Sequence, residues 1–214
     1  DFDLAKSLHH NAHRLSIEWA RIEPQQGQFD EKQMQHYVEV ILALRKRGIE
    51  PFVTLHHFTN PQWFFEMGGW ENPKTAELFE IYTDYVVKAL AKHVSYWMTI
   101  NEPTIISSHA YLFGFWPPQA TSLWRTLKVQ GNQVKAHIKS YRKINEIYKQ
   151  LGLAKPLVGI AHHMPAFVAC QDTLRNRVAV RLRDKAINYW FLDQLAKSKT
   201  MDFIGLNYYS RQLV

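Results

Sequence analysis

Polar side chains that could do chemistry follow four separate apolar runs of this sequence. The four groups are His56 and His57 after the run 51–55, Asn101 and Glu102 after 95–100, His162 and His163 after 156–161, and Asn207, Tyr208 and Tyr209 after 202–206. Tryptophans lie near them in the sequence. Sugars offer hydroxyl groups to carboxylate, amide and imidazole side chains and apolar C–H faces to rings. These residue types therefore favour a site for a neutral, polyhydroxylated ligand.

Other kinds of site are less well supported. The histidines lack Asp or Glu partners at metal-ligand spacing, so we expect no metal. No serine has the context of a hydrolase nucleophile, and the Gly-rich loops that bind nucleotides are absent. A lone strand-end glutamate or histidine can also be structural, so each residue alone is weak evidence. Cys170, the only cysteine, excludes an internal disulfide and is interpreted as a buried or incidental thiol.

The elements that must position these residues alternate between short apolar runs and helical patterns. We expect strands over 13–19, 51–55, 95–100 and 156–161, and a fifth that begins at 202. Helices are predicted over 30–47, after Asn72-Pro73, and over 103–113, 123–151 and 173–197, with Asp30 and Asn72 as caps. Such alternation predicts a parallel sheet covered by helices, whose active sites form at the carboxyl ends of the strands. Periodicity alone leaves open a barrel or a doubly wound sheet.

Composition and charge limit the classes of protein. The 214 residues are 46% hydrophobic, enough for one domain over 1–214, and no apolar run is long enough for a membrane span. Net charge is +7, divided into −4 over residues 1–103 and +11 over 104–214. The basic half could bind nucleic acid, but its cations recur at helical spacing and favour solvated helix faces instead. The single cysteine and the lack of a leader segment suggest a cytoplasmic location.

Five segments carry a resemblance to a known family. They are RLSIEWARIEP (14–24), TLHHFTNPQW (54–63), GGWENP (68–73), TINEP (99–103) and DFIGLNYYS (202–210). In order and spacing they resemble motifs of the retaining β-glycosidases of glycoside hydrolase family one, the β-glucosidase family. The resemblance implies an α/β fold, a (β/α)₈ TIM barrel, of which this chain is similar to strands two to six. It implies no cofactor, and a small β-glycoside as substrate.

The same resemblance implies roles for individual residues. Glu102 matches the general acid/base, Asn101 the residue that binds the sugar 2-hydroxyl, and His57 a histidine that binds glycone hydroxyls. Rings such as Trp97 and Trp63 could line a desolvated pocket around Glu102. Arg14, Asn207 and Tyr209 match residues that surround the nucleophile carboxylate.

The chain also departs from the family pattern. The family's nucleophile is a glutamate in an ITENG-like motif, and this sequence has no such motif. We therefore expect residues 1–214 alone to be inactive, and to pair with the remaining barrel segments or with a second copy. The alternative is a non-catalytic carbohydrate-binding or interaction protein on a glycosidase scaffold. Glu18 and Phe58 replace the usual small residue and tryptophan, and the sequence does not indicate which glycone is bound.

Overall fold

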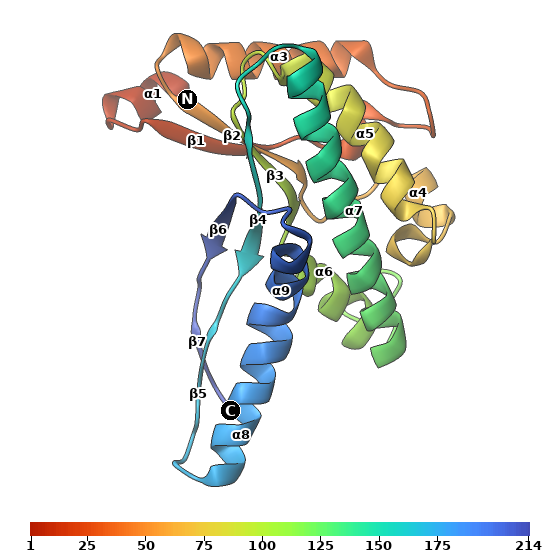
Figure 1. The fold of residues 1–214 in the computed structure, drawn as a ribbon, viewed down its shortest axis with the longest axis vertical. Helices are drawn as coiled ribbons and strands as arrows, with labels where there is room; N and C mark the ends of the chain where they lie inside the picture. The colour runs from red at the N-terminus through yellow and green to blue at the C-terminus, as the bar shows by residue number, and fades with distance from the viewer.

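The main element of the fold is a parallel sheet of five strands. The computed structural model describes residues 1–214. The strands β1 (Ala12–Ser16), β2 (Glu50–His56), β3 (Tyr96–Asn101), β4 (Leu157–His163) and β6 (Phe203–Asn207) lie side by side in chain order (Figure 1). Every neighbouring pair is parallel. A doubly wound sheet reverses its strand order at a switch point, whereas this order runs in one direction, as in a barrel wall. The sheet is therefore part of a TIM barrel.

The first helix precedes the first strand, and the other helices lie between strands. The helices are α1 (Phe2–Ser7), α2 (Trp19–Ile22), α3 (Glu31–Lys46), α4 (Gln62–Glu66), α5 (Thr75–Leu90), α6 (Pro103–Ser107), α7 (Leu123–Gln150), α8 (Leu174–Asp184) and α9 (Trp190–Ser198). Of these, α3, α5, α7 and α9 pack over one face of the sheet. Short 3₁₀ or π turns are η1 (Gly69–Glu71), η2 (Ser108–Leu112) and η3 (Lys185–Tyr189). The Asp30 side chain accepts from the Gln33 amide at 2.9 Å, which is the cap expected at the start of α3. No helix has the length and apolarity needed to cross a membrane.

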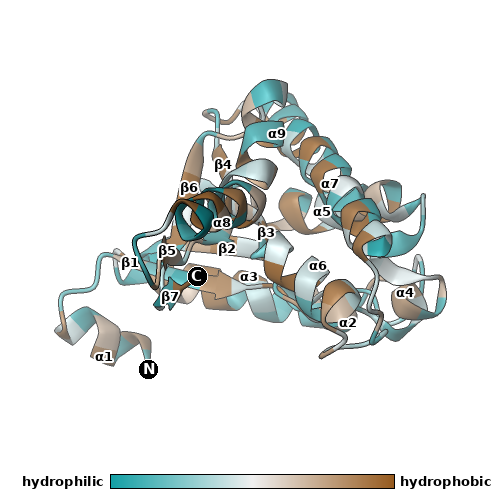
Figure 2. Cartoon of the chain, turned by 90° about the horizontal axis from the view of Figure 1, so that it is seen from below, coloured by the Kyte–Doolittle hydropathy of each residue, from teal (hydrophilic) through white to brown (hydrophobic).

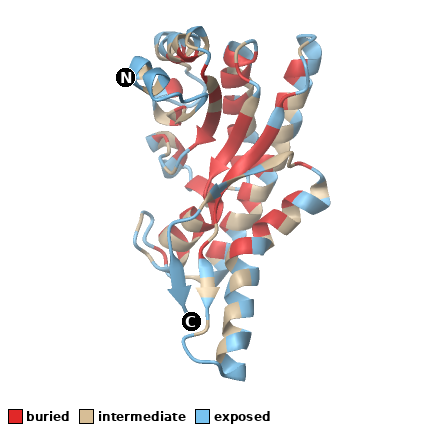
Figure 3. Cartoon of the chain, turned by 90° about the vertical axis from the view of Figure 1, so that its left-hand side faces the viewer, coloured by how far each residue is buried: buried red, intermediate tan, exposed pale blue.

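The core lies between the helices and the three central strands. Figure 3 shows the buried residues concentrated there, while α8 and the strands beside the C-terminus are exposed. Trp19 is the centre of an aromatic group, stacked on Tyr82 at 5.0 Å and tilted against Phe64 at 4.8 Å. Helix α8 has no buried residue, and its ribbon in Figure 2 is coloured for both hydrophobic and hydrophilic residues.

Three features differ from the sequence-based expectation. Asn72 was expected as the cap of the next helix, but α5 begins at Thr75 with Lys74 as its N-cap, and the Asn72 side chain accepts from the Lys74 amide at 2.8 Å. The strand expected over 13–19 ends at Ser16, because the Glu18 carboxylate accepts from the Ala20 amide and starts α2. A second, two-stranded parallel sheet joins β5 (Ala166–Val168) to β7 (Arg211–Leu213) and was not predicted. It extends beyond the carboxyl ends of β4 and β6 (Figure 1). Its strands have three residues each, too short to give a clear alternating pattern.

Candidate active site

Five of the six predicted site residues form one hydrogen-bonded group, here called the polar cluster: Arg14, Asn101, Glu102, Asn207 and Tyr209. They come from β1, from the end of β3 and from the end of β6, which lie far apart in the sequence. The parallel sheet brings them together at one end of the sheet.

Glu102 lies at the centre of the polar cluster and is only 5% exposed. Its backbone is left-handed, with φ of +47°, at the point where β3 ends and α6 begins. Such a conformation is costly for a residue with a Cβ, and strained residues of this kind cluster at functional sites. The Glu102 amide is held by the Ala161 carbonyl at 2.7 Å, which anchors this turn against β4.

The two carboxylate oxygens of Glu102 are in different environments. Oε1 accepts from Asn207 Nδ2 at 2.6 Å and from the Tyr209 hydroxyl at 3.3 Å. Oε2 makes no hydrogen bond within the chain, so it is the oxygen that could carry a proton to a ligand. The family resemblance implied that Asn207 and Tyr209 surround the nucleophile carboxylate, whereas in this structure both donate to Glu102 itself.

Arg14 connects the first strand to the third. Its Nη2 donates to Asn101 Oδ1 at 2.6 Å, and its Nε donates to Thr54 Oγ1 at 3.0 Å. Burial lowers the pKa of Arg14, and the charges of Glu102 and Tyr209 act in the opposite direction. Thr54 was not expected to take part. The available signal was that it is the only polar residue in the run 51–55.

Asn101 is oriented by its neighbours. Its Oδ1 accepts from Arg14 and, at 3.3 Å, from Asn207. Asn101 is only 1% exposed. With the oxygen occupied by two donors, the Nδ2 group is left without a partner in the chain. That group can donate to a ligand hydroxyl.

The four strand-end histidines divide into two kinds. His57 is exposed beside the polar cluster. Its pKa is lowered mainly by desolvation and also by the charge of Arg14, while the charges of Glu102 and Glu18 oppose the shift. His163 stacks on Tyr209 at 5.5 Å. His56 and His162 instead bond to Asn60 and to backbone carbonyls of η3, and burial lowers the pKa of each to about 4. Of the four histidines, only His57 and His163 border the site.

Other sequence-based interpretations need correction. Trp97 and Trp63 do not line a pocket around Glu102. Trp97 is fully buried and donates to the Tyr148 hydroxyl at 2.8 Å, and Trp63 donates to the Glu23 carbonyl at 2.8 Å. Cys170 is exposed.

No second carboxylate joins Glu102 in the polar cluster. Glu18 is occupied as the cap of α2 and by the Thr59 hydroxyl at 2.6 Å. The five acidic residues that follow Glu102 contact partners elsewhere, in the pairs Glu146–Lys143, Asp172–Arg177, Asp184–Asn188, Asp193–Lys185 and Asp202–Lys155. No three His, Cys, Asp or Glu side chains converge as metal ligands.

The sequence and the fold of this chain both match proteins of one family. Residues 1–199 match the sequence model of glycosyl hydrolase family 1. Beta-glucosidase A of Acetivibrio thermocellus is 30% identical over 203 residues, covering 93% of this chain and 44% of the relative. A 6-phospho-beta-galactosidase of Lacticaseibacillus casei is 31% identical over 195 residues, covering 90% and 40%. A solved beta-glycosidase from Pyrococcus horikoshii superposes with a TM-score of 0.89 at 36% identity, covering 98% and 50%. The chain thus spans about half the length of these relatives, or less.

Proposed function

Because this chain belongs to glycosyl hydrolase family 1, we propose that it forms the acid/base-bearing part of a β-glycosidase that retains anomeric configuration. The observation that carries the proposal is the geometry of Glu102. Its Oε1 is held by two donors and its Oε2 is free, at the carboxyl end of a barrel strand. The relatives include a beta-glucosidase and a 6-phospho-beta-galactosidase, which supports a terminal β-linked sugar as the substrate class.

In the first step, Glu102 Oε2–H protonates the glycosidic oxygen as the bond to the anomeric carbon breaks and a second carboxylate attacks that carbon. In the second step, the Glu102 carboxylate takes a proton from the water that displaces the enzyme carboxylate. Asn207 donates to Oε1, so Oε2 is the oxygen that releases the proton in the first step and takes one up in the second.

Retaining chemistry needs the two carboxyl groups about 5–5.5 Å apart. Each of the other acidic side chains discussed above is engaged away from Glu102, so we propose that the nucleophile is supplied by residues outside 1–214. Arg14 has an Nη1 group without a partner in the chain, and with Tyr209 it would orient that carboxylate. Residues 1–214 alone are then inactive.

Substrate recognition is assigned to His57, Asn101 and Asn207. His57 is exposed beside Glu102 and is available to a glycone hydroxyl. The free Nδ2 of Asn101 suits the sugar 2-hydroxyl, a contact that strengthens in the transition state of retaining enzymes.

The test is the release of 4-nitrophenol from 4-nitrophenyl β-D-glucoside. Residues 1–214 alone should give no release above the buffer rate, and adding the remaining barrel segments of a family member in trans should produce it. Glu102→Gln should then abolish the restored activity, while the exposed Glu39→Gln serves as a matched control. Hydrolysis by residues 1–214 alone that Glu102→Gln abolishes would refute the external nucleophile. Restored activity that survives Glu102→Gln would refute the role of Glu102.

A non-catalytic sugar-binding protein is the second candidate, favoured by the lack of a second carboxylate near Glu102. It predicts that calorimetry detects glucose binding to the reassembled barrel without any turnover. Turnover in that assembly excludes it.

A further inference from the structure

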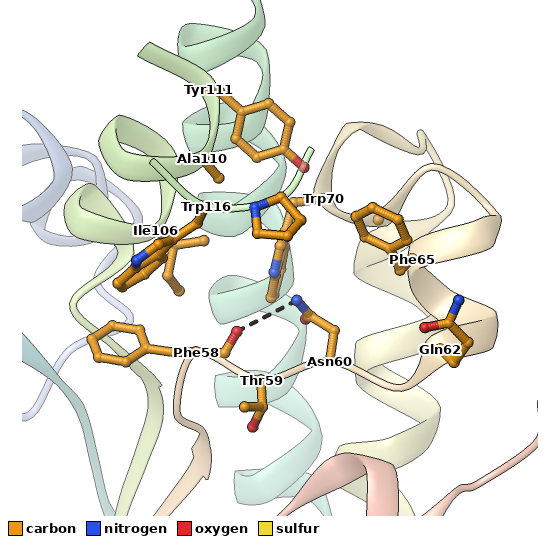
Figure 4. A pocket seen from close by; sticks show the side chains of 12 residues that line it. Phe58, Thr59, Asn60, Gln62, Phe65, Trp70, Ile106, Ala110, Tyr111 and Trp116 are labelled. Atoms are coloured by element: carbon orange, nitrogen blue, oxygen red, sulfur yellow. Dashed lines mark hydrogen bonds between the residues drawn. The ribbon is translucent and has the colours of Figure 1, made fainter. Parts of the chain in front are cut away.

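Two cavities lie on opposite faces of the helical segment that follows β3, which comprises α6 and η2. From this segment Ile106, Ala110 and Tyr111 line the first cavity, whereas Ile105, Ser108, His109 and Leu112 line the second. The first, of about 440 Å³, faces the segment after β2, and none of its lining residues is charged (Figure 4). The second, of about 590 Å³, is enclosed by the start of α7 and by α8 with η3. Only the second cavity has a permanently charged side chain in its wall, that of Arg183.

The second cavity adjoins the proposed acid, Glu102. Thr104 lines the cavity and lies in the first turn of α6, two residues after Glu102. His163 lines it from the end of β4 and stacks on Tyr209 at 5.5 Å, and the Tyr209 hydroxyl donates to Glu102 Oε1. The cavity is therefore next to the Glu102 carboxyl group on the side of β4.

The sugar and the leaving group of a glycoside need different places around Glu102. His57 and Asn101, which bind the sugar in the proposed function, stand at the ends of β2 and β3. The acid must reach the oxygen that joins the sugar to the leaving group, so the leaving group begins beside Glu102. The second cavity is the space on the β4 side that can receive it.

The charge in this cavity is positive and has no counter-charge within the chain. Arg183 is exposed and makes no hydrogen bond or ion pair, and no lining residue is acidic. The acidic residues that follow it, Asp184 and Asp193, are bonded to Asn188 and Lys185 instead. A free guanidinium group suits a carboxylate, which it can bind with two parallel hydrogen bonds.

The rest of the wall suits an apolar body. Nine of the 18 lining residues are hydrophobic, among them Trp190. Several polar groups are already used within the chain, since the Thr126 hydroxyl donates to the Ser122 carbonyl at 2.9 Å and Gln130 Nε2 donates to the Ser107 hydroxyl at 3.0 Å. A ligand with many hydroxyl groups would find few free partners, whereas a ring or hydrocarbon with one anionic group would fit.

We propose that the leaving group of the substrate is an apolar alcohol or phenol that carries a carboxylate, which Arg183 binds in the second cavity. This inference rests on the proposed function, because it needs Glu102 as the acid. The proton of Glu102 Oε2 passes to the glycosidic oxygen as the bond to the anomeric carbon breaks. The leaving group then departs as a neutral hydroxyl compound whose carboxylate stays ionised.

The binding part is tested without turnover, by equilibrium dialysis of 6-hydroxy-2-naphthoate and of neutral 2-naphthol against residues 1–214. The carboxylate should bind about tenfold more tightly than 2-naphthol. Arg183→Gln should weaken the carboxylate about tenfold and 2-naphthol less than twofold. The matched control is Arg181→Gln, which alters an exposed arginine of α8 outside the cavity and should weaken either probe less than twofold. Leu127→Ala, in the apolar wall, should weaken both probes about threefold.

Urea unfolding of each variant checks that it is folded. The proposal is overturned if the two probes bind equally, if folded Arg183→Gln keeps the preference for the carboxylate, or if Arg181→Gln removes it as well. Equal binding of both probes by folded Leu127→Ala and the wild type would also overturn it, because the ligands would then lie outside the cavity.

The role as leaving-group site is tested in the barrel reassembled with the remaining segments. The ratio of kcat/KM for 6-carboxy-2-naphthyl β-D-glucoside to that for 2-naphthyl β-D-glucoside should fall about tenfold in Arg183→Gln and stay within twofold in Arg181→Gln. Hydrolysis of both glucosides with an unchanged ratio in Arg183→Gln would refute this inference alone. Absence of hydrolysis of either glucoside would refute the proposed function and the leaving-group role together.

Discussion

Lowering the pH from 7 to 5 should destabilise this chain through His137, a histidine at the middle of α7. The residue is fully buried, with Nδ1 bonded to Thr99 Oγ1 at 2.7 Å and Nε2 to the Thr200 carbonyl at 2.6 Å. Burial lowers its pKa from 6.5 to about 4, opposed by the bond to Thr200 and the charge of Asp202. His137 therefore stays neutral in the folded chain at pH 5, whereas in the unfolded chain it is protonated.

The sign and size of the effect follow from linkage. Between pH 6.5 and 4 the unfolded state binds more protons, so the free energy of unfolding falls as the pH falls through this range. The full difference of pKa corresponds to about 3 kcal/mol, of which about 2 kcal/mol is lost by pH 5. Below pH 4 this group causes no further loss.

The assay is urea unfolding of the wild type and of His137→Gln at pH 7 and pH 5. The variant is less stable at both pH values, but its loss between them should be smaller than that of the wild type by about 2 kcal/mol. His36→Gln, which alters an exposed histidine, should keep the full wild-type loss. If His137→Gln and the wild type lose the same stability between pH 7 and 5, the reasoning is refuted.

Two pairs of substitutions test the backbone. A Cβ on Gly159 would lie 2.1 Å from the Phe203 carbonyl oxygen, so Gly159→Ala should lower the free energy of unfolding by at least about 3 kcal/mol. Gly131 lies in α7 with open space around it, so Gly131→Ala should raise the free energy of unfolding by about 0.5–1 kcal/mol. Equal urea midpoints for the two variants would contradict this prediction. Glu102→Gly should be about 1 kcal/mol more stable than Glu102→Ala, because only glycine adopts φ of +47° without strain, and calorimetric melting checks the order.

Much of the site could be predicted because motif residues stand at strand ends, where a parallel sheet gathers them. Glu102 Oε1 and Asn207 Nδ2 are 2.6 Å apart although the two residues are 105 positions apart in the sequence. What the pattern could not supply is the direction of each side chain. Trp97 lies close to Glu102 in the sequence, but the pleat of β3 turns it toward α7 and Tyr148.

Other features depend on contacts with no local signature. The paired histidines illustrate this, since His56 and His57 are identical in type and adjacent in sequence. One is buried against Asn60 and the other is exposed at the site. The short strands β5 and β7 form only because the ends of β4 and β6 already lie together, so no periodicity within either segment could predict them.

The polar cluster also has a mechanical consequence. Arg14 on β1 binds Asn101 at the end of β3, and Asn207 at the end of β6 binds Glu102, so two hydrogen-bonded ties cross the concave side of the sheet like chords across an arc. Such ties fix how sharply the wall curves. The position of the Glu102 carboxyl group is therefore coupled to the curvature of the sheet. A sugar hydroxyl that displaced Asn207 from Glu102 would change both.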